Sequence, residues 1–259
     1  MKTWIKITGI ILILFFAGCT KEDDLKLPVR TNMIMRINPY YLDVNKEINE
    51  FQLIESKVSI QKIEFEGIRE AGENVFFETD PDTNLSIVEV EAYIAVNTRY
   101  KGYDAAITDF DLPQGIYRSI RIDIYLNEIS DNEITDNDEV DSPNIGWVIT
   151  GKYGHWKDYD EYFFGFPDFS FPIVFVVDSN EKFIFRTMQE VVMKQPESEI
   201  VLNFNIIHAF YSLDYKLFEE AEISGDSTDQ KIIISNNQNK DLYDMLLYRL
   251  GMNTTMVVN

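Results

Sequence analysis

The sequence predicts a mainly β protein with the architecture of an antiparallel β-sandwich. Several segments alternate apolar and polar residues with the period of two that marks a half-buried strand. About nine such segments occur, and few strong helical patterns lie between them. The 259-residue chain is 45% hydrophobic and has one cysteine, so a hydrophobic core has to hold the fold without an internal disulfide.

The clearest strand pattern covers residues 116–126. Ile116, Ile120, Ile122, Ile124 and Leu126 share one face there, with polar residues and tyrosines opposite. In residues 58–65 the apolar positions change parity, which predicts a β-bulge near Gln61 and Lys62. The other predicted strands are residues 33–37, 74–78, 87–96, 145–153, 171–177, 182–186 and 199–210.

Helical patterns are concentrated near the end of the sequence. Leu242, Met245, Leu246 and Leu250 repeat with helical spacing, and we expect Asn239 to cap this helix and Gly251 to end it. A shorter helix is predicted over residues 213–222. Both are expected to cover one end of the sandwich, so that residues 31–259 form a single domain with a helical cap over 213–259.

Residues 1–18 have the features of a secretory signal peptide. Two lysines precede an apolar run over 7–16, which is shorter than the roughly 20 residues that span a bilayer. The following Ala17-Gly18-Cys19 resembles a bacterial lipobox. The resemblance implies cleavage before Cys19 and attachment of fatty acyl chains such as palmitate, which anchor a protein to a membrane. An ordinary signal peptide with an unmodified Cys19 is the alternative.

Residues 19–30 are predicted to form an acidic tether. Lys21, Glu22, Asp23 and Asp24 resemble the signal that sends Bacteroidota lipoproteins to the outward face of the outer membrane. The resemblance implies display at the cell surface. A solvated tether without an export role, on a protein that faces the periplasm, is the alternative.

The segment Leu112-Pro113-Gln114-Gly115-Ile116-Tyr117 predicts a turn that leads into a strand. Pro113 fixes φ, Gly115 permits a positive φ, and Tyr117 begins the strand. This segment resembles the Leu-Pro-x-Gly-x-Tyr turn of an uncharacterised family of Bacteroidota surface lipoproteins with a domain of unknown function. The resemblance implies a Greek-key sandwich of the transthyretin or immunoglobulin type, and it carries over no catalytic residues.

An acidic stretch over residues 128–141 contains no Lys or Arg. Asp136, Asp138 and Asp141 offer the oxygen ligands that calcium prefers, although their spacing is not that of an EF-hand. The two interpretations are a calcium site and a solvated loop. We expect no other cofactor.

Aromatic residues are dense between 153 and 171 and alternate with carboxylates and glycines. Trp156, Tyr159 and Tyr162 could stack on a sugar while the neighbouring acids accept hydrogen bonds. The alternative is that this segment fills the core under a long loop. His155 lies within it, and His208 is expected on the apolar face of the strand over 199–210, in both cases as a packed residue and not a metal ligand.

The net charge and the absence of several catalytic motifs restrict the classes of function that fit the sequence. With 44 acidic and 23 basic residues, the net charge of −21 disfavours binding to nucleic acid. The sequence lacks an HExxH motif, a phosphate-binding loop and a nucleophile elbow. We therefore expect a noncatalytic surface lipoprotein that binds a glycan or an envelope protein. An envelope structural or adhesion subunit and a glycan-active hydrolase are the alternatives.

Overall fold

The computed structural model describes residues 27–37, 48–79, 85–91, 103–129, 144–156, 169–187, 189–194 and 197–259. These residues form two β-sheets and a few short helices, which confirms the predicted mainly β sandwich. Ten of the twelve strand pairings are antiparallel, and the β1–β11 and β8–β13 pairings are parallel. Within the described part of the chain, no helix has the length and apolar character needed to cross a bilayer.

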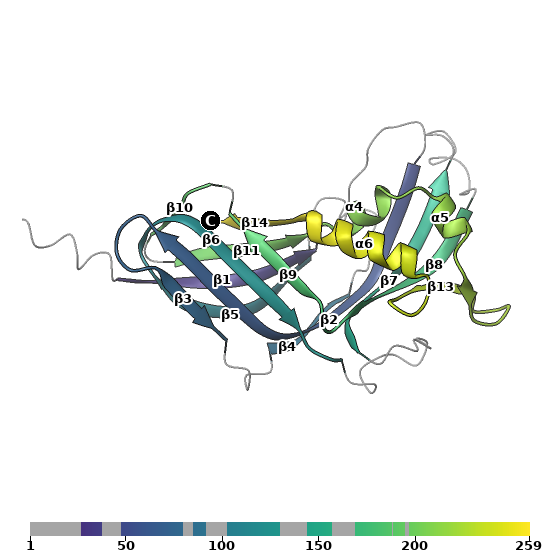
Figure 1. Ribbon diagram of the computed structural model, residues 1–259, viewed down its shortest axis with the longest axis horizontal. Helices are drawn as coiled ribbons and strands as arrows, with labels where there is room; N and C mark the ends of the chain where they lie inside the picture. Colours follow the sequence, from purple (N-terminus) through teal and green to yellow (C-terminus); the bar gives the residue numbers. More distant parts are fainter. Residues whose placement is uncertain are drawn as a thin grey trace, which may run out of the picture.

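The smaller sheet has four strands in the order β14-β11-β1-β5. It packs against one half of the larger sheet, and together they form the two-layered part of the molecule (Figure 1). Its strands are β1 (Pro28–Ile37), β5 (Tyr103–Pro113), β11 (Glu197–Phe204) and β14 (Thr254–Val258).

The larger sheet has ten strands and is organised by the 22-residue strand β2. The first half of β2 pairs with β7 and β4, and the second half pairs with β6 and β3. Its strands are β2 (Ile48–Arg69), β3 (Val75–Glu78), β4 (Leu85–Glu91), β6 (Gly115–Leu126), β7 (Ile145–Trp156), β8 (Phe169–Asp178), β9 (Lys182–Arg186), β10 (Val191–Met193), β12 (Ile223–Ser224) and β13 (Lys231–Ile234).

The bulge predicted in β2 is present. The register between β2 and β6 shifts between Ile60 and Lys62, so one residue of β2 has no partner there. Val58 and Ile60 before the shift, and Ile63 and Phe65 after it, are all buried. The extra residue therefore lets the apolar side chains on both sides of this shift face the core.

The face predicted for the start of β6 is wrong. Ile116 is 38% exposed, whereas Tyr117 is buried. Arg118 has no partner in β2, and this register shift reverses the alternation between Tyr117 and Ser119. The Tyr117 hydroxyl donates a hydrogen bond of 2.7 Å to the carbonyl of Pro113. Gly115 has φ of 145°, as the turn prediction requires.

The predicted strand over 199–210 ends at Phe204 and is followed by a helix. Helix α4 (Ile206–Tyr211) buries Ile206, Ile207, Ala209 and Phe210. Ile206 and Phe210 are four residues apart, which fits both the period of a helix and the alternation of a strand. The Phe210 ring stacks on Phe51 of β2 with centroids 3.9 Å apart, which anchors α4 to the sheet. His208 is therefore a half-buried helix residue and not part of a strand face.

Two further helices complete the cover of β7, β8 and β13 (Figure 1). Helix α5 (Lys216–Glu219) is shorter than predicted, and α6 (Lys240–Met252) passes through Gly251 instead of ending there. Asn239 precedes α6 in a left-handed conformation, but its side chain binds Glu222 and Ile233 and does not cap the helix. Residues 213–259 also contain the strands β12, β13 and β14.

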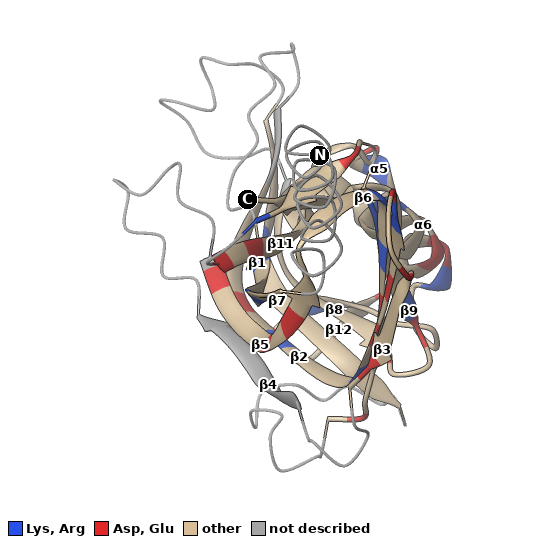
Figure 2. Ribbon diagram, turned by 90° about the vertical axis from the view of Figure 1, so that its left-hand side faces the viewer, with Lys and Arg blue, Asp and Glu red and all other residues tan. Residues whose placement is uncertain are grey.

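The larger of two hydrophobic clusters among the described residues runs through the sandwich and the helix-covered half. Trp147 lies near its centre, with Phe183 and Phe204 at 5.5 and 4.9 Å in edge-on geometry. The Trp147 indole N–H donates a 2.8 Å hydrogen bond to Ser56 Oγ, so this buried donor is satisfied. Viewed end-on in Figure 2, the strands of both sheets surround this core.

The close packing of Tyr117 gives a stability prediction. A Cβ on Gly67 would lie 2.7 Å from Tyr117 Cε1, so we expect Gly67→Ala to lower the free energy of unfolding by about 1–3 kcal/mol. Gly251→Ala is the matched control, because a Cβ there meets nothing within 4 Å and alanine raises helix stability by about 1 kcal/mol. Urea unfolding of both variants measures the difference. Equal effects of the two substitutions would contradict the Tyr117 contact.

Candidate binding surface

Most of the residues singled out from the sequence lie outside the described ones. They are Cys19, Lys21, Glu22, Asp23, Asp24, Asp136, Asp138, Asp141, Tyr159 and Tyr162. The calcium and export interpretations therefore stay predictions. Within the described ranges, no group of three or more His, Cys, Asp or Glu side chains is placed to hold a metal ion.

The described beginning of the aromatic segment belongs largely to the core. Tyr153 and His155 are buried, and the His155 ring stacks on Tyr215 with centroids 3.7 Å apart. Trp156 is half-buried at the end of β7, and its ring lies over Gly154, where a Cβ would come within 2.6 Å of it. Trp156 therefore packs against the sheet, and the sugar contacts of Tyr159 and Tyr162 stay predictions.

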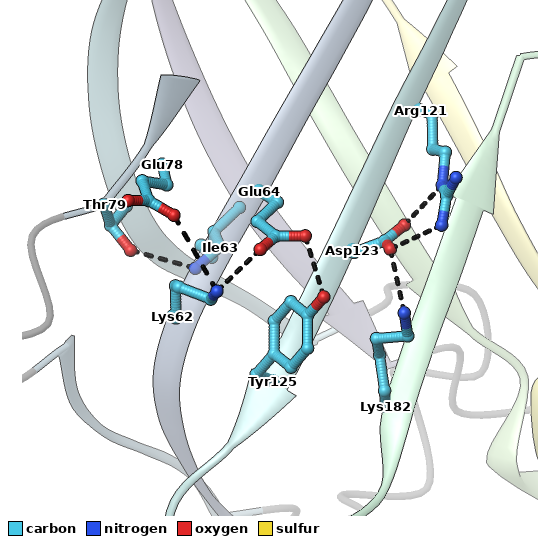
Figure 3. A network of polar contacts seen from close by, with 9 residues as sticks. All are labelled: Lys62, Ile63, Glu64, Glu78, Thr79, Arg121, Asp123, Tyr125 and Lys182. Carbon is cyan, nitrogen blue, oxygen red and sulfur yellow. Dashed lines mark hydrogen bonds and ion pairs between the residues drawn. The ribbon is translucent and has the colours of Figure 1, made fainter. Parts of the chain in front are cut away.

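A dense set of charged side chains covers the outer face of β3, β2, β6 and β9. Figure 3 shows them from close by, and in Figure 2 basic and acidic residues lie close together on β6 and β9. Cross-strand register places Glu64 beside Asp123, and Tyr125 between Lys62 and Lys182. We call this set the charged face; it consists of Lys62, Glu64, Glu78, Arg121, Asp123, Tyr125 and Lys182.

Asp123 is the most buried carboxylate of the charged face, with 5% of its side chain exposed. Arg121 donates two hydrogen bonds to it, at 2.8 and 2.7 Å, and Lys182 Nζ donates a third at 3.1 Å. Burial alone would raise the pKa of Asp123, but the bonds from Arg121 and Lys182 outweigh it and hold this pKa below its usual value. Asp123 is therefore a fixed anion that orients two cations.

Tyr125 connects the ion pairs of Asp123 with the ion pair of Glu64. Its ring lies between two ammonium groups, with Lys62 Nζ at 4.5 Å and Lys182 Nζ at 5.1 Å from the centroid. Its hydroxyl donates a hydrogen bond of 2.7 Å to Glu64 Oε2, and Lys62 Nζ donates one of 2.6 Å to Glu64 Oε1. The bond from Lys62, followed by that from Tyr125, lowers the pKa of Glu64. The network leaves this face neutral in total and holds its side chains in place.

An apolar groove adjoins the charged face beyond β9. It lies between β9 and α6 and has a volume of about 430 Å³. Tyr248 and Met252 of α6 are 69% and 67% exposed at its wall, and Ile184 of β9 is 40% exposed. We call it the β9–α6 groove; its lining is Glu181, Lys182, Phe183, Ile184, Asp244, Leu247, Tyr248, Gly251 and Met252. Lys182 belongs to both features, so they form one continuous surface.

Carboxylates give the groove an acidic side. Partial burial, and then the nearby carboxylates of Asp178 and Asp244, raise the pKa of Glu181, against the opposing effect of Lys240. Asp244 forms an ion pair of 2.9 Å with Lys240. A cation brought to this side of the groove would therefore be attracted to Glu181.

Comparisons with known proteins do not identify the chain: no protein-family model, curated protein or solved structure matches it. The resemblance to the Bacteroidota lipoprotein family accordingly stays a prediction. The candidate surface formed by the charged face and the groove was not predicted from the sequence either. Its one signal was the polar side of residues 116–126, where Arg121, Asp123 and Tyr125 alternate with the buried isoleucines.

The ion pairs of Asp123 predict a pH-dependent stability. Because the pKa of Asp123 is lower in the folded protein than its usual 3.8, the stabilisation is complete above about 3.8 and is lost as the pH falls through the folded value. We expect Asp123→Asn to cost about 1.5–3 kcal/mol at pH 7 and to remove this part of the acid sensitivity.

Asp109→Asn is the matched control for Asp123→Asn. Asp109 pairs with Arg30 at 3.1 Å, but both side chains are more than half exposed, so its loss should cost less than about 1 kcal/mol. Urea unfolding of both variants between pH 3 and 7 provides the comparison. A loss for Asp123→Asn no larger than that for Asp109→Asn would show that the burial of Asp123 contributes nothing.

Proposed function

We propose that the chain is a noncatalytic lipoprotein of the bacterial outer membrane, and that it binds a partner at the cell surface. The observation that carries the binding role is the continuity of a fixed charged face with an exposed apolar groove through Lys182. Exposed apolar side chains that are grouped together and bordered by charges are typical of interaction sites. Side chains that are already held in ion pairs lose little further entropy when a partner binds.

The chemistry of the charged face also supports a binding role. A general acid works best when its pKa lies near the ambient pH. The pKa values of Asp123 and Glu64 are shifted downward by their cation partners, so both carboxylates stay ionised near neutral pH. They are suited to fixing neighbouring cations and not to donating protons.

The anchoring role is supported by the sequence. Ala17-Gly18-Cys19 has the form of a lipobox, and the acidic residues behind it have the form of a surface-export signal. Acyl chains on Cys19 would contribute about 0.8 kcal/mol per buried methylene group, and two or more chains give stable anchoring. The folded part of the chain would then be held near the membrane by the residues between Cys19 and the start of β1 at Pro28.

The anchoring part of the proposal predicts a Cys19-dependent membrane location. We expect the wild-type protein to fractionate with outer membranes, to carry acyl chains on its amino-terminal residue by mass spectrometry, and to be digested by protease added to intact cells. Cys19→Ser should appear in soluble fractions, because it lacks the sulfur that accepts the lipid.

A second variant separates export from lipidation. Replacing the carboxylates of Glu22, Asp23 and Asp24 by amides should protect the lipidated protein from external protease while leaving it in the membrane. Wild-type protein that is released into the medium, or cleaved at a site other than before Cys19, would contradict the proposal.

An envelope structural subunit is a second candidate, because β14 forms one edge of the four-stranded sheet. Val257 on this strand is 45% exposed, and an open edge can accept a strand from a neighbouring chain. Sedimentation of the purified protein over a range of concentrations distinguishes the two candidates. Concentration-dependent assembly that Val257→Lys abolishes would favour the structural role.

A further inference from the structure

Gly251 is not explained by the internal structure of the chain. It lies in the last turn of α6, its φ is not positive, and a Cβ placed on it would meet nothing within 4 Å. Neither backbone conformation nor packing therefore requires glycine there, and glycine weakens a helix relative to alanine. Its effect is to leave space in the wall of the β9–α6 groove, where the backbone of another chain can approach closely.

The groove has the size and walls of a site for side chains. Its volume of about 430 Å³ lies within the usual range of binding pockets. Tyr248 and Met252 rise from the last turns of α6, and Ile184 faces outward from β9. An apolar side chain placed over Gly251 would shield these three from water, which is the main favourable contribution in protein association.

Charge complementarity selects the partner. Glu181 lies on the acidic side of the groove, close enough to Asp178 and Asp244 for their charges to act on it. Lys182, which lines the groove, is paired with Asp123, and Lys240, whose charge acts on Glu181, is paired with Asp244. A second copy of a chain with a net charge of −21 would be repelled, whereas a basic side chain from another protein would be attracted.

We infer that the β9–α6 groove binds a short segment of a partner protein that carries an apolar side chain next to a Lys or Arg. The apolar side chain lies over Gly251, between Ile184 and Tyr248, and the basic side chain pairs with Glu181. This inference rests on the proposed binding function and specifies its partner.

A library of random 12-residue peptides displayed on phage tests the inference on the purified full-length protein. We expect the recovered sequences to place a Lys or Arg within about four residues of a Leu, Ile, Met or Phe, because side chains that far apart can lie on the same side of a short peptide. One recovered peptide is then synthesised for affinity measurements. Gly251→Phe fills the groove and should raise its Kd about tenfold or more.

Ile184→Ser gives an independent test in case Gly251→Phe does not fold, and we expect it to raise the Kd at least about threefold. Its matched control is Ile54→Ser, because Ile54 is also an exposed strand isoleucine of the larger sheet and lies in the first half of β2. Ile54→Ser should leave the Kd within about twofold.

A double-mutant cycle tests the ion pair. Glu181→Gln should raise the Kd of the peptide that carries the basic residue by about fivefold or more. It should have little effect on the Kd of the same peptide with that residue replaced by norleucine. Equal effects on both peptides would overturn the role of Glu181.

Other outcomes overturn the inference as a whole. These are the recovery of no peptide whose binding depends on Ile184 or Gly251, the recovery of acidic peptides, and a dimer of the purified protein that either groove substitution dissociates. The Cys19 experiments test the anchoring part of the proposed function separately, and peptides that bind independently of the groove would leave its binding part standing, so these failures are distinguishable.

Discussion

The fold depends on one strand that serves two halves of the molecule. β2 pairs with β7 along its first half and with β6 along its second, and Ile60, where the two halves meet, pairs with Leu126 of β6. With strict alternation, Val58 and Ile60 in the middle of β2 would face opposite to the apolar residues at positions 51 and 53 and at positions 63 and 65. Two register shifts remove this conflict, one after Leu53 against β7 and one after Ile60 against β6, so that all these residues face the core that extends through the sandwich and under the helices.

The same register sets the chemistry of the outer surface. Once Ile63 and Phe65 face inward, Lys62 and Glu64 must face outward, where the pairing with β6 places them beside Tyr125 and Asp123. Strand β9 then adds Lys182 on the other side of Tyr125. A backbone irregularity that solves a packing problem in the core therefore also aligns the ion pairs of the charged face.

Features that depend on a few neighbouring residues could be predicted from the sequence. The alternation of β6 from Ile120 onward, the parity change in β2, the strand β9 and the helical spacing before Gly251 are each visible within a short stretch of sequence, and the structure contains each. The strand–helix boundary after Phe204 was missed because Ile206 and Phe210 fit both periods, and packing of Phe210 on Phe51 decides between them. The β9–α6 groove joins residues about 60 positions apart, and no local pattern records such a meeting.

The distribution of cations explains why the groove and not the charged face is the place for a basic partner. The chain has 23 basic residues against 44 acidic ones, so cations are scarce. On the charged face Lys62, Arg121 and Lys182 are bonded to carboxylates at 2.6 to 3.1 Å, and an incoming cation would have to displace them. Partial burial of Glu181, and then the carboxylates around it, raise its pKa, while Lys240 is held by Asp244. A partner's cation would reduce that repulsion without breaking an existing ion pair, which favours the groove wherever both surfaces are within its reach.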